Sequence, residues 1–215
     1  MALVALIVIR PFVRSDLVEL LLGTLVLVSA VTAVGGRRRT LTAALLLLTP
    51  ALAGKWVDHL RPDLVPAAVI SGAEMAFIGF VIFNLLRFVL RAPRVDSEIL
   101  CAALSVYLML GLVWAIAYEL LGQVFPDAFA FSTGPSAAHS LEGFSAFYFS
   151  FVTLSTVGYG DIAPVSEAAR MLAVTEAITG TLYVAVLIAR LVSLYSSPAR
   201  SGEGTVAPRT GSRSS

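Results

Sequence analysis

The chain has 215 residues, of which 58% are hydrophobic and only 13% charged, and its mean hydropathy is +0.88. This composition excludes an ordinary soluble domain and predicts an integral membrane protein in the lipid bilayer. The net charge of +1 gives no sign of nucleic-acid binding, because the basic residues lie in short runs between apolar stretches. The single cysteine, Cys101, lies in an apolar run, so we expect a small buried side chain there.

The first apolar stretch, residues 2–9, is too short to cross a bilayer unless its helix continues through Arg10 and Pro11. A secretory signal peptide carries positive charge before its apolar region, whereas here Arg10 and Arg14 follow it. We therefore expect this stretch to be retained. It forms either an interfacial segment or part of a further span.

Five longer apolar stretches approach the roughly 20 residues that a transmembrane helix needs. They are Leu17–Val34, Leu41–Val57, Val65–Leu90, Ile99–Leu121 and Ala168–Tyr195. The second is short and contains Pro50, which leaves its ends open. The sequence thus predicts an all-α membrane protein, a helical bundle in which three or four N-terminal helices, within residues 1–95, precede the last two spans. The role of residues 1–95 is not indicated.

The span Val65–Leu90 lacks the pattern of a voltage sensor, which needs basic residues repeated through one helix so that the membrane field can move charge. Glu74 lies in its first half, next to small residues, and we expect it to make a helix contact. Basic residues begin only at Arg87, near the end of the span. We therefore predict weak or no voltage dependence.

The segment Phe144–Leu154 is apolar and rich in aromatic residues, but it is too short to span. A re-entrant helix of this kind is tolerated at membrane depth where protein or a water-filled cavity surrounds the irregular backbone that follows it. Its carboxyl end carries the negative end of the helix dipole, which attracts a cation.

The string T-V-G-Y-G-D, residues 156–161, directly follows this helix. Gly158 and Gly160 lack a Cβ and can adopt dihedral angles that turn successive carbonyls toward one axis. Val157 and Tyr159 alternate with them and are expected to point away and pack behind the strand. The Thr156 hydroxyl supplies one more oxygen. A plain turn between two helices is the alternative interpretation of the glycines.

The string resembles the selectivity filter of the potassium channel family, in which carbonyl oxygens replace the water shell of the ion. With its flanking helices, the resemblance covers about residues 98–195 and implies a pore domain at 96–196. It implies that Thr156, Val157, Gly158, Tyr159 and Gly160 form the ion-binding filter and that K⁺ is the permeant ion, with no organic cofactor and no enzyme activity. Ser155 and Asp161 flank the filter as supporting residues.

Members of this family often join the aspartate after the filter to an aromatic residue of the pore helix. Tyr148 occupies the similar position here, so the resemblance implies a hydrogen bond from the Tyr148 hydroxyl to Asp161. The alternative for Tyr148 is an interfacial tyrosine of the aromatic belt.

The inner helix expected over Ala168–Tyr195 carries two gating candidates, Gly180 and Glu176. Gly180 lies where two-span relatives have a hinge glycine, and it serves either as a hinge or as a close helix contact. Glu176 is a carboxylate inside a span, which is costly and therefore a functional candidate. It either faces the pore or backs the filter, hydrogen-bonded to a hydroxyl such as that of Ser150. Arg190 is expected to extend to the cytoplasmic interface.

The positive-inside rule orients the spans in the cell membrane. The cytoplasmic group is Arg37, Arg38, Arg39, Arg87, Arg91, Arg94, Arg190, Arg200, Arg209 and Arg213, and the outer group is Arg10, Arg14, Lys55, Arg61 and Arg170. This arrangement places the filter toward the outer face and the C-terminus in the cytoplasm. Residues 197–215 have the composition of a disordered tail.

One filter strand cannot encircle an ion, so the resemblance implies a homotetramer that conducts potassium passively. A membrane scaffold or auxiliary subunit with a pore-like fold that does not conduct is the alternative. A transporter with broken helices would favour paired interrupted segments in both halves of the chain, and the sequence has no such pairing.

Overall fold

The computed structural model describes residues 38–61, 65–92, 96–132 and 141–195, together with short pieces between residues 21 and 31 that are helical. Within this part of the chain, four helices are long and apolar enough to cross a membrane. They confirm the last four expected spans and the all-α membrane class. Most of the expected span Leu17–Val34, the N-terminal stretch and the tail 197–215 lie outside the described residues.

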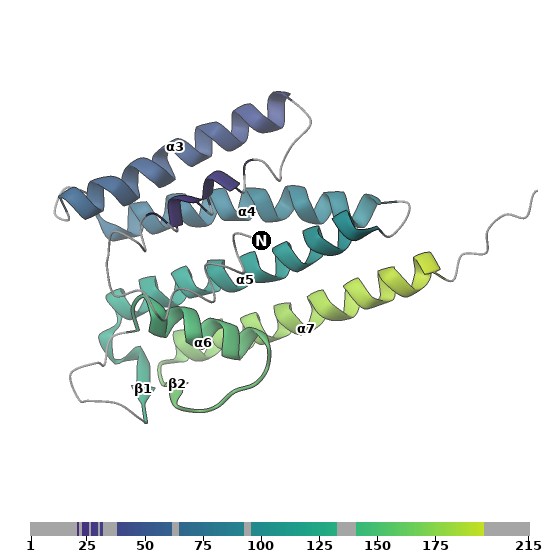
Figure 1. Cartoon of the computed structure of the whole chain (residues 1–215). Helices are drawn as coiled ribbons and strands as arrows, with labels where there is room; N and C mark the ends of the chain where they lie inside the picture. Colours follow the sequence, from purple (N-terminus) through teal and green to yellow (C-terminus); the bar gives the residue numbers. More distant parts are fainter. Residues whose placement is uncertain are drawn as a thin grey trace, which may run out of the picture.

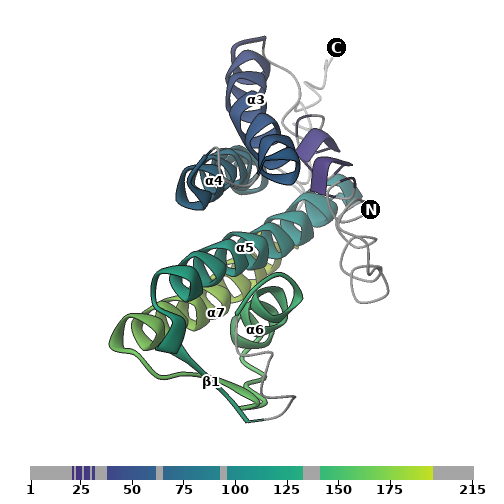
Figure 2. The same cartoon turned by 90° about the vertical axis from the view of Figure 1, so that its left-hand side faces the viewer.

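The four long helices are α3 (Arg38–Leu60), α4 (Ala67–Arg91), α5 (Ser97–Val124) and α7 (Glu167–Tyr195). The short helix α6 (Phe144–Leu154) has the bounds expected from the sequence. In Figures 1 and 2, α3 and α4 pack together on one side of α5, while α6 and α7 lie on its other side. Helix α5 is therefore the common wall between the N-terminal helices and the C-terminal module.

Helix α3 continues through Pro50, although the sequence left its ends open. A proline has no backbone N–H, so the carbonyl of Leu46, four residues earlier, loses its helical partner. The Thr49 hydroxyl donates to that carbonyl at 3.1 Å. A neighbouring side chain thus satisfies the freed oxygen, as a helix in an apolar environment requires.

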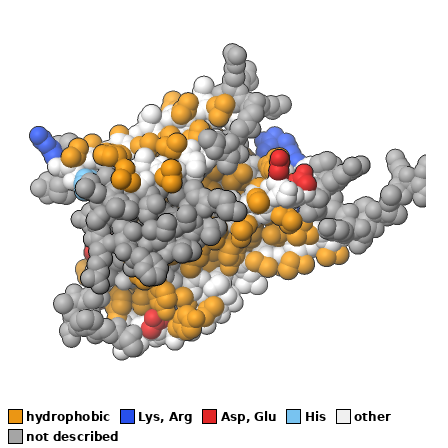
Figure 3. Space-filling model, in the orientation of Figure 1, with side chains coloured by type: hydrophobic (Ala, Val, Ile, Leu, Met, Phe, Trp, Pro, Cys, Tyr) orange, Lys and Arg blue, Asp and Glu red, His pale blue; other side chains and the backbone are white. Residues whose placement is uncertain are grey.

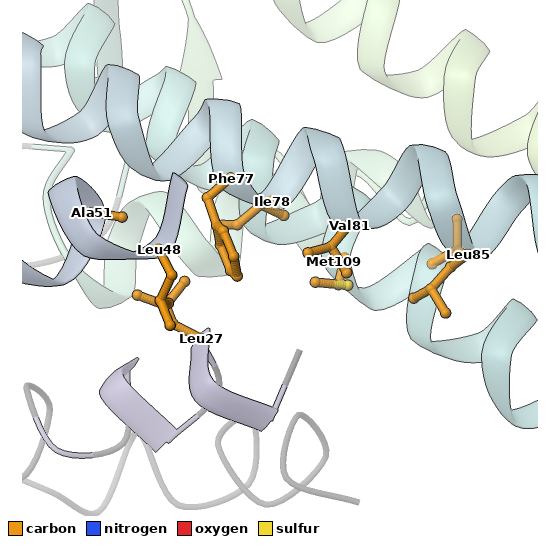
Figure 4. Packing of buried hydrophobic residues seen from close by; sticks show 9 residues of the cluster. Leu27, Leu48, Ala51, Phe77, Ile78, Val81, Leu85 and Met109 are labelled. Carbon is orange, nitrogen blue, oxygen red and sulfur yellow. The ribbon is translucent and has the colours of Figure 1, made fainter. Parts of the chain in front are cut away.

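A buried cluster joins the N-terminal helices to α5 (Figure 4). Phe77 and Val81 on α4 are fully buried in it, against Leu48 and Ala51 of α3 and Met109 of α5. These side chains fill the space between three helices, and close packing of this kind is the main attraction between helices where the surroundings are themselves apolar.

The outer surface of the described helices is also apolar. In Figure 3 hydrophobic side chains cover most of the described face, and the Lys and Arg side chains lie toward the two ends of the helices.

A two-stranded antiparallel ribbon, which the sequence did not indicate, flanks the filter segment. Strand β1 (Phe129–Phe131) follows the short turn η2 (Pro126–Ala128) after α5, and β2 (Ile162–Pro164) follows Asp161. Phe129 pairs with Pro164, and Phe131 pairs with Ile162. The ribbon fixes the chain leaving the filter segment against the end of α5.

Two side chains differ from the sequence expectation. Cys101 is exposed on α5 in the single chain rather than buried, because the buried face of that helix is formed by other residues, such as Ile99 and Ala103. Arg190 does not simply extend to an interface. Its Nη2 donates to the carbonyls of Leu90 and Ala92, at 3.1 and 3.0 Å. A cation is favourable at these carbonyls because they end α4, where the helix dipole is negative.

Candidate functional site

The candidate site is the segment from Ser155 to Asp161, which directly follows α6. Its backbone amides turn back toward the helix. Thr156 N donates to the carbonyl of Thr153 at 2.9 Å, and Val157 N donates to that of Val152 at 2.9 Å. Gly158 N makes a longer bond of 3.4 Å to the same Val152 carbonyl. The amides in the first half of this segment are therefore bonded to the end of α6.

The carbonyl oxygens of the segment have no such partner. In the described part of the chain, no hydrogen-bond donor contacts the carbonyls of Thr156, Val157, Gly158 or Tyr159. The Gly160 carbonyl differs, since the Ser132 hydroxyl oxygen lies 3.5 Å from it, while that hydroxyl makes a shorter contact of 3.1 Å with the Asp161 carbonyl. Four consecutive carbonyls thus remain available for an external partner, and the fifth faces the ribbon.

The backbone of the segment alternates in handedness. Gly158 and Gly160 have φ of 58° and 79°, and Thr156, a β-branched residue, also has a φ of 58°. This region is open to glycine but costs a β-branched residue about 1 to 3 kcal/mol. Strain of this size persists only where surrounding structure holds it, and here the amide bonds to α6 do so. Gly158 and Gly160 therefore adopt the positive φ angles for which the sequence analysis expected glycine.

The side chains of Val157 and Tyr159 do not pack behind the segment within one chain. Val157 is 52% exposed and Tyr159 is 72% exposed. Tyr159 stacks on Tyr148 with a ring-centroid distance of 6.5 Å and nearly parallel planes. Any further packing against these two side chains must come from outside the single chain.

Tyr148 on α6 donates a hydrogen bond from its hydroxyl to Asp161 Oδ2 at 2.9 Å, which confirms the contact that the resemblance implied. Partial burial and the Asp161 carboxylate raise the pKa of Tyr148 above its ordinary value of 10.0, so the phenol keeps its proton and can donate. The bond joins the helix before the filter segment to the residue after it. Ser155 makes a local bond, from its hydroxyl to the Phe151 carbonyl at 2.6 Å.

We expect Tyr148→Phe to weaken the segment by about 0.5 to 1.5 kcal/mol, because it removes one hydrogen bond at a partly exposed site and keeps the aromatic ring. The measurement is the free energy of unfolding of the purified protein in detergent. Tyr107→Phe is a control for loss of a tyrosine hydroxyl, since Tyr107 makes only a long 3.4 Å bond to the Leu154 carbonyl. An unchanged free energy of unfolding in Tyr148→Phe would reject a supporting role for the bond.

Glu176 on α7 packs against α6, as in the expected alternative in which it backs the filter, and it does not lie on an exposed face that could line a pore. It is fully buried, with Oε1 2.6 Å from the Ser150 hydroxyl and Oε2 2.6 Å from the Tyr118 hydroxyl. The sequence named Ser150 as a partner but gave no sign of Tyr118, because Tyr118 lies 58 residues away on α5. Its ring packs edge-on against Phe149 and Phe129, which fixes the position of the hydroxyl.

Gly180 lies against the last residue of α6. A Cβ built at Gly180 would collide with the Leu154 carbonyl oxygen and would lie 2.9 Å from Leu154 Cδ1. Helix α7 continues without interruption through this position. In this conformation the close-contact alternative for Gly180 therefore has a direct structural reason, because only glycine lets α7 approach the base of the filter segment.

Comparison with known proteins identifies the region that contains this site. Residues 102–197, somewhat under half of the chain, match the model of a family described as ion channel. The chain is 32% identical over 133 residues to the voltage-gated potassium channel Kch of Escherichia coli, which covers 58% of this chain and 28% of that protein. It is 35% identical over 85 residues to two pore potassium channel c of Oryza sativa, covering 38% of this chain and 18% of that one.

A third relative, two-pore potassium channel 4 of Arabidopsis thaliana, is 48% identical over 48 residues, which cover 22% of this chain and 17% of that protein. The matches to these three relatives thus span less than a third of the length of each one. No solved structure gives a significant match to the chain.

Proposed function

We propose that this chain is a member of the potassium channel family, through the region at residues 102–197 that matches the ion channel model, and that it conducts K⁺ passively through a pore selective against Na⁺. The relatives named above, which are potassium channels, support this proposal. The pore domain corresponds to residues 96–196, with α5 as the outer helix, α6 as the pore helix and α7 as the inner helix.

The observation that carries the proposal is the row of four free carbonyls from Thr156 to Tyr159. The amides of Thr156, Val157 and Gly158 are bonded to α6, and the four carbonyl oxygens have no donor in the described part of the chain, so they are available to replace water around a dehydrated cation. The Thr156 hydroxyl adds an oxygen at one end of the row. Gly160 continues the backbone, but its carbonyl faces Ser132, so its part in ion binding is the weakest of the five.

A homotetramer is proposed because one strand supplies oxygens from one side only. Apolar side chains of α7 are exposed along most of its length in the single chain, and they include Met171, Val174, Ile178, Leu182, Ile188 and Val192. The side chains of Val157 and Tyr159 are exposed as well, so the single chain leaves apolar area on α7 and on the filter segment that neighbouring copies would cover. Four copies around one axis would cover it and complete the ring of carbonyls.

In the cell membrane, we propose that the filter lies toward the outer face and the C-terminus in the cytoplasm, as the distribution of basic residues indicates. We also propose weak voltage dependence. Arg87 and Arg91, the basic residues of α4, are exposed in its last turns, and Glu74 in its first half pairs with Lys55. A conductance that rises steeply with voltage, with several gating charges per channel, would contradict this assignment.

The test is K⁺ flux against Na⁺ flux into liposomes that contain the purified protein. We expect K⁺ flux to exceed Na⁺ flux strongly, and Gly158→Ala to abolish that difference, because alanine resists the φ of 58° found at Gly158. Gly79→Ala is the matched control, since a Cβ at this helical glycine meets nothing within 4 Å. Equal fluxes, or selective flux that survives Gly158→Ala, would favour the alternative of a scaffold or auxiliary subunit that does not conduct.

A further inference from the structure

Three helices meet at Ser150, and the contacts there contain one hydrogen too few if Glu176 is ionised. The Ser150 hydroxyl oxygen lies 2.6 Å from Glu176 Oε1 and 2.8 Å from the Gly111 carbonyl oxygen. A serine hydroxyl has one hydrogen, while a carbonyl oxygen and an ionised carboxylate have none to donate. Only one of these two short contacts can therefore use the serine hydrogen.

The Gly111 carbonyl fixes the assignment, because its contact with Ser150 can be a hydrogen bond only if Ser150 donates. Glu176 Oε1 must then donate to the Ser150 oxygen, which requires a hydrogen on Oε1. Tyr118 donates its hydrogen to Oε2 at 2.6 Å. In this arrangement each of the short contacts among Tyr118, Glu176, Ser150 and Gly111 has one hydrogen between its two oxygens, whereas an ionised Glu176 leaves one of the two contacts of Ser150 without a hydrogen. All three side chains are fully buried, so a missing partner would be costly.

The described surroundings supply no positive charge that would stabilise an ionised Glu176. The ionisable side chains that face it are the phenols of Tyr107 and Tyr118 on α5, which are neutral at pH 7. On α6, Tyr148 is turned to Asp161, and on α7 Arg170 Nε donates to the Pro164 carbonyl at 3.3 Å. Lys55 pairs with Glu74, and Arg190 caps α4.

We propose that Glu176 is a proton-binding site behind the filter, holding one hydrogen at neutral pH and completing a hydrogen-bond chain from Tyr118 through Ser150 to Gly111. This chain joins α5, α6 and α7 at the level of Ser150, one turn before the end of the pore helix. Its effect on conduction rests on the proposed function, whereas the bound proton does not. Loss of that proton places a negative charge beside α6 and leaves Ser150 with one hydrogen for two acceptors, which weakens its bond to Glu176 on α7 or its bond to Gly111 on α5.

Infrared spectroscopy of the purified wild-type protein in lipid tests the proton directly. A protonated carboxylic acid absorbs in a C=O stretching band separate from the bands of ionised carboxylates. We expect this band at neutral pH in the wild type and in Glu74→Gln, the control for the other buried carboxyl side chain, and its loss in Glu176→Gln. Absence of the band in the wild type, or its persistence in Glu176→Gln, overturns the proposal.

Tyr118→Phe provides a second measurement that does not depend on the folding of Glu176→Gln. Because it removes the donor to Oε2, the C=O band is expected to move to higher frequency, and an unmoved band contradicts the assigned contacts.

Measurements of K⁺ flux then test the effect of the bound proton on conduction separately from the presence of the proton. Glutamine matches the protonated acid in shape and can donate to Ser150, so K⁺ flux is expected to survive in Glu176→Gln and to fall at least tenfold in Glu176→Ala. Flux lost equally in both variants overturns the hydrogen assignment, while a band without any flux in the wild type contradicts only the channel proposal.

Discussion

Gly180→Ala is expected to destabilise the protein by about 1 to 3 kcal/mol and to reduce K⁺ flux. The added Cβ would overlap the Leu154 carbonyl oxygen, a backbone atom that cannot move without moving the start of the filter segment. In an unobstructed helix the same change stabilises by about 1 kcal/mol. If Gly180 acted only as a hinge, Gly180→Ala would stabilise the helix in the same way. A loss of stability therefore indicates the close contact, and a gain indicates the hinge.

The measurement is denaturation of the purified protein in detergent, with Gly79→Ala as the matched control. Gly79 is also helical, and a Cβ there meets nothing within 4 Å. Greater stability of both variants, with lower open probability only in Gly180→Ala, would support the hinge and reject the contact. Reduced flux alone does not separate these roles, because a displaced Leu154 carbonyl alters the filter directly.

Lys55→Met is expected to destabilise the N-terminal helices by about 2 to 3 kcal/mol. Lys55 Nζ on α3 lies 2.9 Å from Glu74 Oε1 on α4, and the Glu74 side chain is only 11% exposed. The contact is an ion pair and not an aligned hydrogen bond, since Glu74 Oε1 has no hydrogen-bond donor in the described part of the chain. Removing the lysine leaves a buried carboxylate without its counter-charge, and breaking a fully buried pair costs about 3 to 5 kcal/mol. Because Lys55 is partly exposed, we expect Lys55→Met to lose less stability than this range.

The double variant Lys55→Met with Glu74→Met is the control for this prediction. It removes both charges and replaces them with apolar side chains, so we expect stability close to that of the wild type. The midpoint of thermal unfolding in detergent, compared for the wild type, both single variants and the double variant, gives the coupling between the two residues. A double variant as unstable as Lys55→Met alone would show that the ion pair is not the cause.

Local patterns in the sequence were sufficient for the features that depend on neighbours along the chain. The apolar runs predicted four of the observed helices, and the bounds of α6 were correct because the short apolar segment ends directly before the string that begins at Ser155 and Thr156. The hydrogen bond from Tyr148 to Asp161 was implied by a resemblance and joins residues only 13 positions apart. The sequence placed Pro50 inside the expected span Leu41–Val57 but left the ends of that span open, and it did not indicate the compensating bond from Thr49, which depends on one side-chain rotamer.

What the sequence by itself determined was therefore the membrane class and the order of the helices, since composition and periodicity report directly on burial in an apolar solvent. Only the tertiary structure decided which distant groups meet. Tyr118 reaches Glu176 across 58 residues, Arg190 reaches α4 across almost 100, and Gly180 meets the Leu154 carbonyl. These contacts depend on the rotation and spacing of packed helices. Neither quantity is encoded in any single stretch of the chain.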